Sequence, residues 1–314
     1  MFCIVAFVVL SILGIFSAAN RALAKEALDC VGRRVTLRPC NTGFDEKIKA
    51  KILGSVIMRS EAAARFINRF FEPLSWIFFI AMLASTIFAV RGVYLFYVTG
   101  SCNGLNSTAF CVFDPNGNNN QVTAVSSNCY VNPPTESDLT LEGADFSSFP
   151  VINPTVTDNK IVFIGCYACD YTRAAYPVMR ELAQKFNVNM IYADYPVKEK
   201  TDYLSRVDYC VNKASTDKFW KLNDALFATA DKSNLENTDY VTQLMSSAGL
   251  DTAQMNVCIN DPQTETAVQN QLTEIKKTKF YGTPTIFING EAFVGPKPYR
   301  VYAIKLKGLL YWIY

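Results

Sequence analysis

The strongest constraint on this fold is an apolar stretch at residues 73–98, PLSWIFFIAMLASTIFAVRGVYLFYV, whose single charge is Arg91. A stretch of this length can cross the hydrocarbon core of a bilayer as a helix. Because lipid offers no partner for backbone N–H and C=O groups, a helix is the expected form. Trp76, Tyr94 and Tyr97 lie towards its two ends, where aromatic residues gather at membrane interfaces. We interpret Arg91 as a side chain that extends to the nearer interface.

A second apolar stretch, FCIVAFVVLSILGIFSAA at residues 2–19, carries no charge. Together with residues 74–98 it predicts a transmembrane hairpin over residues 1–98, with membrane lipid as a partner. The alternative is a signal peptide cleaved after Ala24, but its N-terminal region would lack the usual positive charge. We therefore expect two spans in the cytoplasmic membrane.

The loop between the two spans, residues 20–73, is basic. Residues 20–72 contain eleven Lys and Arg and six acidic residues, an excess of positive charge that is typical of the cytoplasmic side. The loop contains two amphipathic segments, 44–58 and 60–71, which we expect to lie as helices on the inner membrane surface. In this topology everything after residue 98 is extracytoplasmic.

The composition excludes several kinds of chemistry. The 314 residues include no histidine, which removes Ser-His-Asp hydrolysis, Cys-His proteolysis and histidine-ligated zinc. The net charge of +2 does not indicate a nucleic-acid partner. The chain does carry ten cysteines, so thiol chemistry stays available.

Residues 99–154 are rich in Gly, Asn, Pro and Ser, and we interpret them as a small stapled loop followed by a linker. Cys102 and Cys111 close a short segment and are expected to form a disulfide. Asn106 begins an Asn-Ser-Thr triplet, which outside the membrane would permit N-glycosylation.

Residues 155–314 alternate between strand and helix patterns. KIVFIG at 160–165 is a short apolar strand, 169–187 has helical periodicity, and 188–197 is a second strand. Helical patterns fill 201–277, and 284–295 is a hairpin that turns at Asn289-Gly290. A last helix closes the chain. This order predicts an α/β domain with the thioredoxin fold and a helical insertion.

The pair Cys166-Tyr167-Ala168-Cys169 follows the first strand directly. A cysteine where a strand meets a helix faces unpaired N–H groups, and the helix dipole lowers the pKa of its thiol. We therefore expect Cys166 to react first and Cys169, one turn on, to resolve the mixed disulfide. A zinc site would need further cysteine ligands that are not present as a second C-x-x-C, so we expect no metal. An inert structural disulfide is the alternative.

In this order, GCYAC after a strand, DKFWKLNDALFA, AGLDTAQMNVC and GTPTIFING resemble the DsbA-like branch of the thioredoxin superfamily over about residues 155–310. The resemblance implies that Cys166 is the attacking thiol and Cys169 the resolving one. It implies that Thr283-Pro284 is a cis-proline loop beside the pair, where an extended substrate would bind together with Tyr167 and Ala168.

The same resemblance implies a structural disulfide between Cys210 and Cys258. Two features depart from the family. The strand 160–165 has no acidic residue to carry protons, and no histidine lies between the two cysteines. The second departure favours a milder redox potential and leaves open whether the pair oxidises, reduces or isomerises its substrates.

The predicted topology indicates the redox state expected for four other cysteines. Cys129 has no evident partner and would pair with Cys3 or with another chain. Cys30 and Cys40, in the cytoplasmic loop, are expected to be reduced, and a disulfide there would contradict the predicted topology.

The sequence thus predicts a membrane-anchored, extracytoplasmic thiol–disulfide oxidoreductase that acts on protein substrates and needs no cofactor. A dedicated membrane redox partner is a further possibility. The alternative, from a different class, is a redox-inert thioredoxin-fold module that binds peptides along the loop at Thr283 and Pro284.

Overall fold

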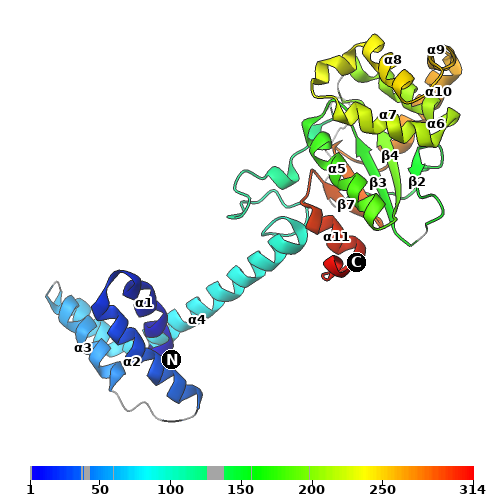
Figure 1. The fold of residues 1–314 in the computed structure, drawn as a ribbon. Helices are drawn as coiled ribbons and strands as arrows, with labels where there is room; N and C mark the ends of the chain where they lie inside the picture. Colours follow the sequence, from blue (N-terminus) through cyan, green and yellow to red (C-terminus); the bar gives the residue numbers. More distant parts are fainter. Residues whose placement is uncertain are drawn as a thin grey trace. The chain divides into compact units, whose positions relative to one another are not determined.

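The computed structural model describes residues 2–36, 38, 43–58, 60–125, 138–156, 158–197 and 199–314. The chain divides into two compact units, residues 1–91 and 92–314. The first unit is helical, and the second contains the sheets (Figure 1).

The N-terminal unit contains three helices before the long apolar segment: α1 (Phe2–Phe16), α2 (Ala18–Val35) and α3 (Phe44–Ile57). The predicted span at 2–19 is thus divided, since one helix ends at Phe16 and the next begins at Ala18. Helices α1 and α2 pack along each other, and α3 contacts both. Their shared core comprises Ala6, Ala27, Cys30, Phe44 and Ile48. The amphipathic segment 44–58 therefore packs on other helices of the unit.

The segment 60–71 and the predicted span 74–98 are merged in one long helix, α4 (Glu61–Thr99). The helix breaks at Phe70, whose φ of −106° and ψ of 17° are not helical. Pro73 explains the break, because a proline inside a helix lacks the N–H donor and its ring crowds the carbonyl four residues earlier.

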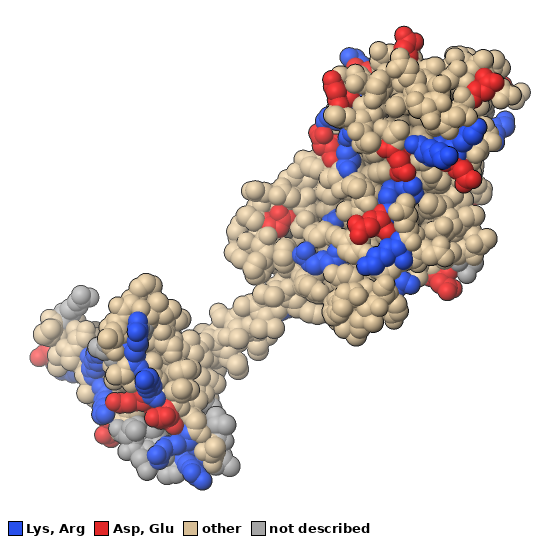
Figure 2. All heavy atoms as spheres, in the orientation of Figure 1, with Lys and Arg blue, Asp and Glu red and all other residues tan. Residues whose placement is uncertain are grey.

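Among the described residues, α4 is the one helix long and apolar enough to cross a membrane. Its apolar window has no residue buried within the protein, and Figure 2 shows the middle of this helix as uncharged surface. Helix α1, with 15 residues, does not meet the same criterion.

The C-terminal unit is built on a five-stranded sheet in the order β2-β4-β3-β6-β7. Its strands are β2 (Val151–Ile152), β3 (Lys160–Gly165), β4 (Asn189–Asp194), β6 (Thr285–Ile288) and β7 (Glu291–Val294). Strands β3 and β4 run parallel, and β2 and the β6–β7 hairpin are antiparallel to their neighbours. The hairpin turns at Asn289-Gly290, both with positive φ, as predicted.

Side chains of β3 alternate between two apolar layers, as the period of a strand requires. Ile161 and Phe163 pack into one layer and Val162 and Ile164 into the other. The first layer is built mainly from the helices α5 (Asp170–Lys185), α6 (Tyr203–Ala214), α7 (Thr216–Ala228) and α11 (Tyr299–Lys307). The second contains α10 (Pro262–Lys277) and the segment 139–151.

Helices α6 and α7, then α8 (Thr238–Ser247), α9 (Thr252–Ile259) and α10, lie between β4 and the next strand of the sheet. They form the helical insertion that the sequence predicts (Figure 1). A second, two-stranded sheet pairs β1 (Thr123–Ala124) with β5 (Gly282–Thr283). Neither β1 nor β2 was expected from the sequence.

The loop after α4 is bound to the domain through Asn106. Its Nδ2 donates to the Ala292 carbonyl at 2.9 Å, and its Oδ1 accepts from the Val294 amide at 2.8 Å. Asn106 is 6% exposed, so the predicted glycosylation site is buried against β7. A glycan on Nδ2 would break the first of these hydrogen bonds.

Candidate functional site

The cysteine pair lies at the end of β3, where the chain turns into α5. A disulfide joins Cys166 to Cys169. The Cys169 amide donates to the Cys166 carbonyl at 3.2 Å, which closes a tight turn. Helix α5 begins at Asp170 with Cys169 as its N-cap, within one residue of the start predicted for the segment 169–187. Cys169 is therefore the cysteine directly before the first turn of the helix.

Strand β6 brings the predicted proline loop beside the pair. Its antiparallel register sets Ile164 opposite Thr285, so the chain positions before Thr285 run beside those after Ile164. The peptide bond between Thr283 and Pro284 is cis. Thr283 is fully buried, and its hydroxyl has no hydrogen-bond partner among the described residues.

Both sulfurs of the pair are inaccessible in this conformation. Cys166 is 0% and Cys169 1% exposed, and they cluster with Ala168 and the partly buried Val197. A protein thiol therefore cannot reach either sulfur without a local opening.

Tyr167 contributes to the core and not to the surface. It is 1% exposed and packs against Tyr192 and Phe227. Its hydroxyl donates to the Asp208 carboxylate, at 2.7 and 2.9 Å from the two oxygens, and accepts from Asn223 Nδ2 at 3.0 Å. The expected contact of the Tyr167 ring with substrate is thus not available here. The ring instead fixes the active-site turn to helices α6 and α7.

A second buried carboxylate lies next to the strand that precedes the cysteines. Asp194 ends β4 in register with Gly165, and Ser205 Oγ donates to it at 2.6 Å. Burial raises the pKa of Asp194 to about 7, although the hydrogen bond from Ser205 lowers it in part. Burial and the neighbouring charge of Asp194 also raise the pKa of Asp208 well above its usual value. The buried acids near the cysteine pair are therefore in β4 and α6, whereas β3 has no acidic residue.

Arg173 adds a cation to the site. Its Nη1 donates to the carbonyls of Tyr167 and Leu226, each at 3.2 Å, and its Nη2 donates to the Thr229 carbonyl. It therefore ties the turn between the cysteines to the end of α7. Partial burial lowers the pKa of Arg173 from its usual value, and the charge of Asp170 opposes this. Sequence reasoning missed this residue, although it lies one helical turn after Cys169.

Two further disulfides staple the C-terminal unit at the expected positions. Cys102 is bonded to Cys111, and Cys210 to Cys258. Cys30 is also disulfide-bonded, so the expectation that it is reduced is wrong. Its partner is outside the described side chains, as are Cys3, Cys40 and Cys129.

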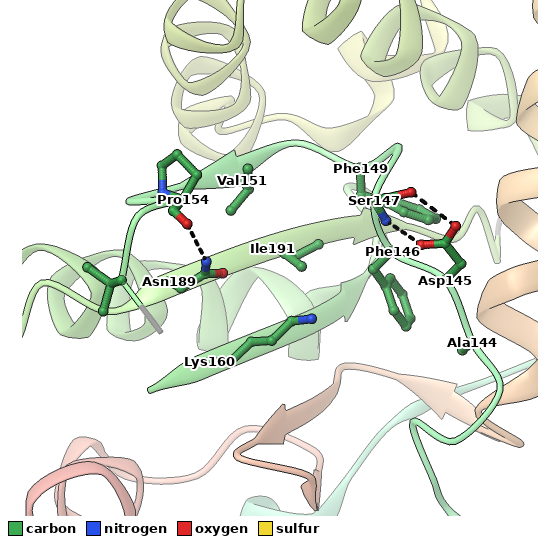
Figure 3. Close-up of a pocket in the computed structure, with 11 residues that line it drawn as sticks. Ala144, Asp145, Phe146, Ser147, Phe149, Val151, Pro154, Lys160, Asn189 and Ile191 are labelled. Carbon is green, nitrogen blue, oxygen red and sulfur yellow. Dashed lines mark hydrogen bonds between the residues drawn. The ribbon is translucent and has the colours of Figure 1, made fainter. Parts of the chain in front are cut away.

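The domain has a pocket of about 530 Å³ lined by residues of β2, β3, β4 and the segment before β2 (Figure 3). It lies towards the start of β3 and β4, whereas the cysteines follow the end of β3. Its lining includes Lys160 at the start of β3 and Asn189 at the start of β4. The pocket therefore has no part in chemistry at Cys166. The described residues contain no cluster of acidic residues and cysteines that could hold a metal ion.

The fold and the site define a thioredoxin-fold domain with a Cys-x-x-Cys disulfide beside a cis-proline. Residues 158–304 match the model of the family described as Thioredoxin. The C-terminal half of the chain thus contains a domain with the thioredoxin fold, as predicted. No curated protein sequence matches the chain.

Several solved structures are similar over this half of the chain. The thiol-disulfide exchange protein alpha-DsbA2 from Wolbachia pipientis is 18% identical, with a TM-score of 0.45, over 52% of this chain and 88% of that one. The catalytic domain of Proteus mirabilis ScsC is 20% identical, with a TM-score of 0.46, over 53% and 90%. Oxidised BdbD from Bacillus subtilis is 17% identical, with a TM-score of 0.44, over 52% and 96%.

Proposed function

We propose that the C-terminal unit is a thiol–disulfide oxidoreductase that exchanges its Cys166–Cys169 disulfide with cysteines of protein substrates. One observation carries the proposal: the disulfide closes a tight turn between β3 and α5, at the end of the sheet where the loop at Thr283 and Pro284 leads into β6. A purely structural disulfide would not need the start of a helix, whose N–H groups stabilise a thiolate.

In the oxidising direction, the exchange takes place in two steps. A substrate thiolate attacks Cys166 Sγ, the Cys166–Cys169 bond breaks, and Cys169 leaves as a thiolate at the N-cap of α5. A second substrate thiolate then attacks the substrate sulfur of the mixed disulfide and releases Cys166 as a thiolate. Two electrons pass from the substrate to the pair. Reduction of a substrate disulfide runs through the same mixed disulfide in reverse.

The surrounding residues give both thiolates support. Arg173 lies against the turn and supplies positive charge, which favours the thiolate over the thiol. Asp194 has a pKa of about 7, so it can hold or release a proton near neutral pH beside the strand that leads to Cys166. We assign Asp194 the part of proton carrier that the sequence left without a residue.

We further propose that α4 anchors the domain in the cytoplasmic membrane with the thioredoxin domain outside. Three disulfides in residues 92–314 fit an oxidising compartment. The apolar part of α4 has the length and exposure of a membrane span. Whether residues 2–19 form a second span stays a prediction, since α1 and α2 pack together as a short helical pair.

The Cys30 disulfide is at odds with a reducing environment for residues 20–73. A membrane-impermeant maleimide, applied after mild reduction to intact cells and to opened cells, tests this placement. If residues 20–73 are cytoplasmic, Cys30 is labelled after the cells are opened and not before. Labelling of Cys30 in intact cells after mild reduction would place residues 20–73 outside the cytoplasm and contradict the predicted topology.

A redox-inert peptide-binding module is the second candidate. The full burial of Cys166 and Cys169 favours it, because an inert disulfide needs no access. The oxidoreductase should turn over thiol or disulfide substrates, whereas the redox-inert module should not.

Substitution of Cys166 by serine tests the proposal in the full-length protein. We expect Cys166→Ser to abolish reduction of insulin and oxidation of a reduced protein substrate. Cys102→Ser is the matched control, since it also removes one disulfide of the same unit, and it should keep turnover. Equal turnover of the wild-type protein and Cys166→Ser would contradict the proposal.

A further inference from the structure

The segment 122–125, which we call the internal strand, lies along the chain that precedes Pro284. Thr123 pairs with Thr283, and Ala124 with Gly282, in antiparallel register. The pairing continues at Val125, whose amide donates to the Tyr281 carbonyl at 3.0 Å. The internal strand comes from the loop after α4, more than 150 residues before its partner in sequence.

Two glycines of the domain are close enough to this segment that no side chain would fit. A Cβ on Gly282 would lie 2.5 Å from Val122 Cγ2 and 3.0 Å from the Thr123 carbonyl oxygen. A Cβ on Gly295 would lie 2.8 Å from the backbone of residues 120 and 121. The contacts at Gly295 are with backbone, and those at Gly282 are with the Val122 side chain and the Thr123 carbonyl, so the internal strand fits here because both positions lack side chains.

The residues just before the internal strand are held in place by polar contacts. Asn119 Nδ2 donates to the Gly100 carbonyl at 2.8 Å, and Asn120 Nδ2 to the Ser107 carbonyl at 2.9 Å. The buried Lys297 donates its Nζ to Asn120 Oδ1. The Cys102–Cys111 disulfide staples the same loop. The internal strand is thus positioned by a rigid loop on the domain.

The occupied edge is the one a substrate needs. The β3–β6 register ends with Ile164 opposite Thr285, so Cys166 and Thr283, each two residues further along its strand, come to the same end of the sheet. A substrate sulfur that attacks Cys166 brings its own backbone next to Thr283, and an extended chain there can pair with residues 281–283. The internal strand already makes those pairs on the outer edge of Thr283.

We propose that the internal strand is an autoinhibitory strand, displaced when an extended segment of a protein substrate pairs with residues 281–283 in its place. The proposal rests on the proposed function and identifies the kind of partner that fits. The substrate segment is extended, has no proline at the paired positions, and has a backbone close to Gly282. The burial of Cys166 at 0% exposure agrees with a closed state.

Val125→Pro in the full-length protein tests the displacement directly. Proline removes the N–H that donates to Tyr281, whereas the control Val125→Ala shortens the side chain and keeps the N–H. The readout is the rate at which iodoacetamide alkylates Cys166 in the reduced protein, followed by mass spectrometry of its peptide. We expect Val125→Pro to react about tenfold faster than the wild type and Val125→Ala to react like the wild type.

Thermal melting establishes that the Val125→Pro variant is folded. Gly282→Ala is a second variant that should displace the internal strand, since its Cβ would clash with Val122. Both variants should accelerate alkylation, and equal rates in the wild type and both folded variants would overturn the proposal. If alkylation accelerates but insulin is not reduced, the result supports the inhibitory role of the internal strand and contradicts the proposed function. If alkylation is unchanged and insulin is reduced, the function stands and the internal strand is not inhibitory.

Discussion

The two buried carboxylates make the stability of the domain depend on pH in a window where the chain has no histidine to titrate. Asp194 is 8% and Asp208 7% exposed, and the pKa of each is raised by burial. The chain has no histidine, so between pH 5 and 7 the raised acids dominate the proton balance of folding.

The native state binds these protons more tightly than the unfolded chain does. Raising the pH therefore favours the unfolded chain, and stability present at low pH is lost as the pH rises towards the native pKa. For Asp194, a pKa raised from 3.8 to about 7 corresponds to about 4 kcal/mol at high pH. About 2 kcal/mol of this loss falls between pH 5 and pH 7, and Asp208 adds to it in the same direction.

Asp194→Asn removes the titration and keeps an oxygen that can accept from Ser205 Oγ. We expect the free energy of unfolding of oxidised residues 92–314, from urea titrations at pH 5, 6 and 7, to fall by ~2 kcal/mol or more in the wild type. The fall should be smaller by about that amount in Asp194→Asn. Asp145→Asn is the control, since this exposed acid has a lowered pKa and is ionised throughout the window.

The reasoning is refuted if the wild-type free energy of unfolding is constant from pH 5 to pH 7. It is also refuted if Asp194→Asn has the same slope as the wild type, because another group would then carry the titration.

Three further predictions concern single contacts. Arg173→Gln should raise the pKa of the Cys166 thiol, measured by the pH dependence of thiolate absorbance at 240 nm, and an unchanged pKa would exclude Arg173 as a source of thiolate stabilisation. Asn106→Ala should lower the free energy of unfolding by about 1–3 kcal/mol, because it leaves the Val294 amide without its acceptor, and the wild-type protein should show no mass shift on deglycosylation. Serine at both Cys210 and Cys258 should cost about 2–4 kcal/mol in urea unfolding while turnover persists, and loss of turnover in folded protein would assign that disulfide a role in exchange.

The elements that the sequence predicted well are those with strong local patterns. KIVFIG is a run of buried residues that becomes β3 without a shift in its bounds, and the Asn-Gly pair fixes the β6–β7 turn. The order of strands, the helical insertion and the location of Cys166 all follow from such patterns.

What the sequence missed depends on contacts between distant segments. Strand β1 has two residues and exists through its pairing with β5, so it carries no periodicity of its own. Asn106 matches a glycosylation triplet, but a triplet does not encode burial against β7. Asp194 and Asp208 are ordinary acids in sequence and become unusual through burial beside each other.

In the N-terminal unit, the predicted first span is divided between two helices. Residues 2–19 have no charge and predict one continuous span, yet helix α1 ends at Phe16 and packs along α2. Apolar composition is common to membrane helices and to helices that bury one face on a neighbour, and only length and partners distinguish them.

The reduction potential of the Cys166–Cys169 pair tests the central claim most directly. The full-length protein is equilibrated in glutathione redox buffers, and the thiols of the pair are quantified by alkylation and mass spectrometry. We expect one two-electron transition between about −300 and about −120 mV, the range between structural disulfides and strong oxidants. Because the dipeptide has no histidine, we expect the potential to lie away from the strongly oxidising end of this range. A pair that stays oxidised below about −300 mV would be a structural disulfide, and the proposed exchange activity would be wrong.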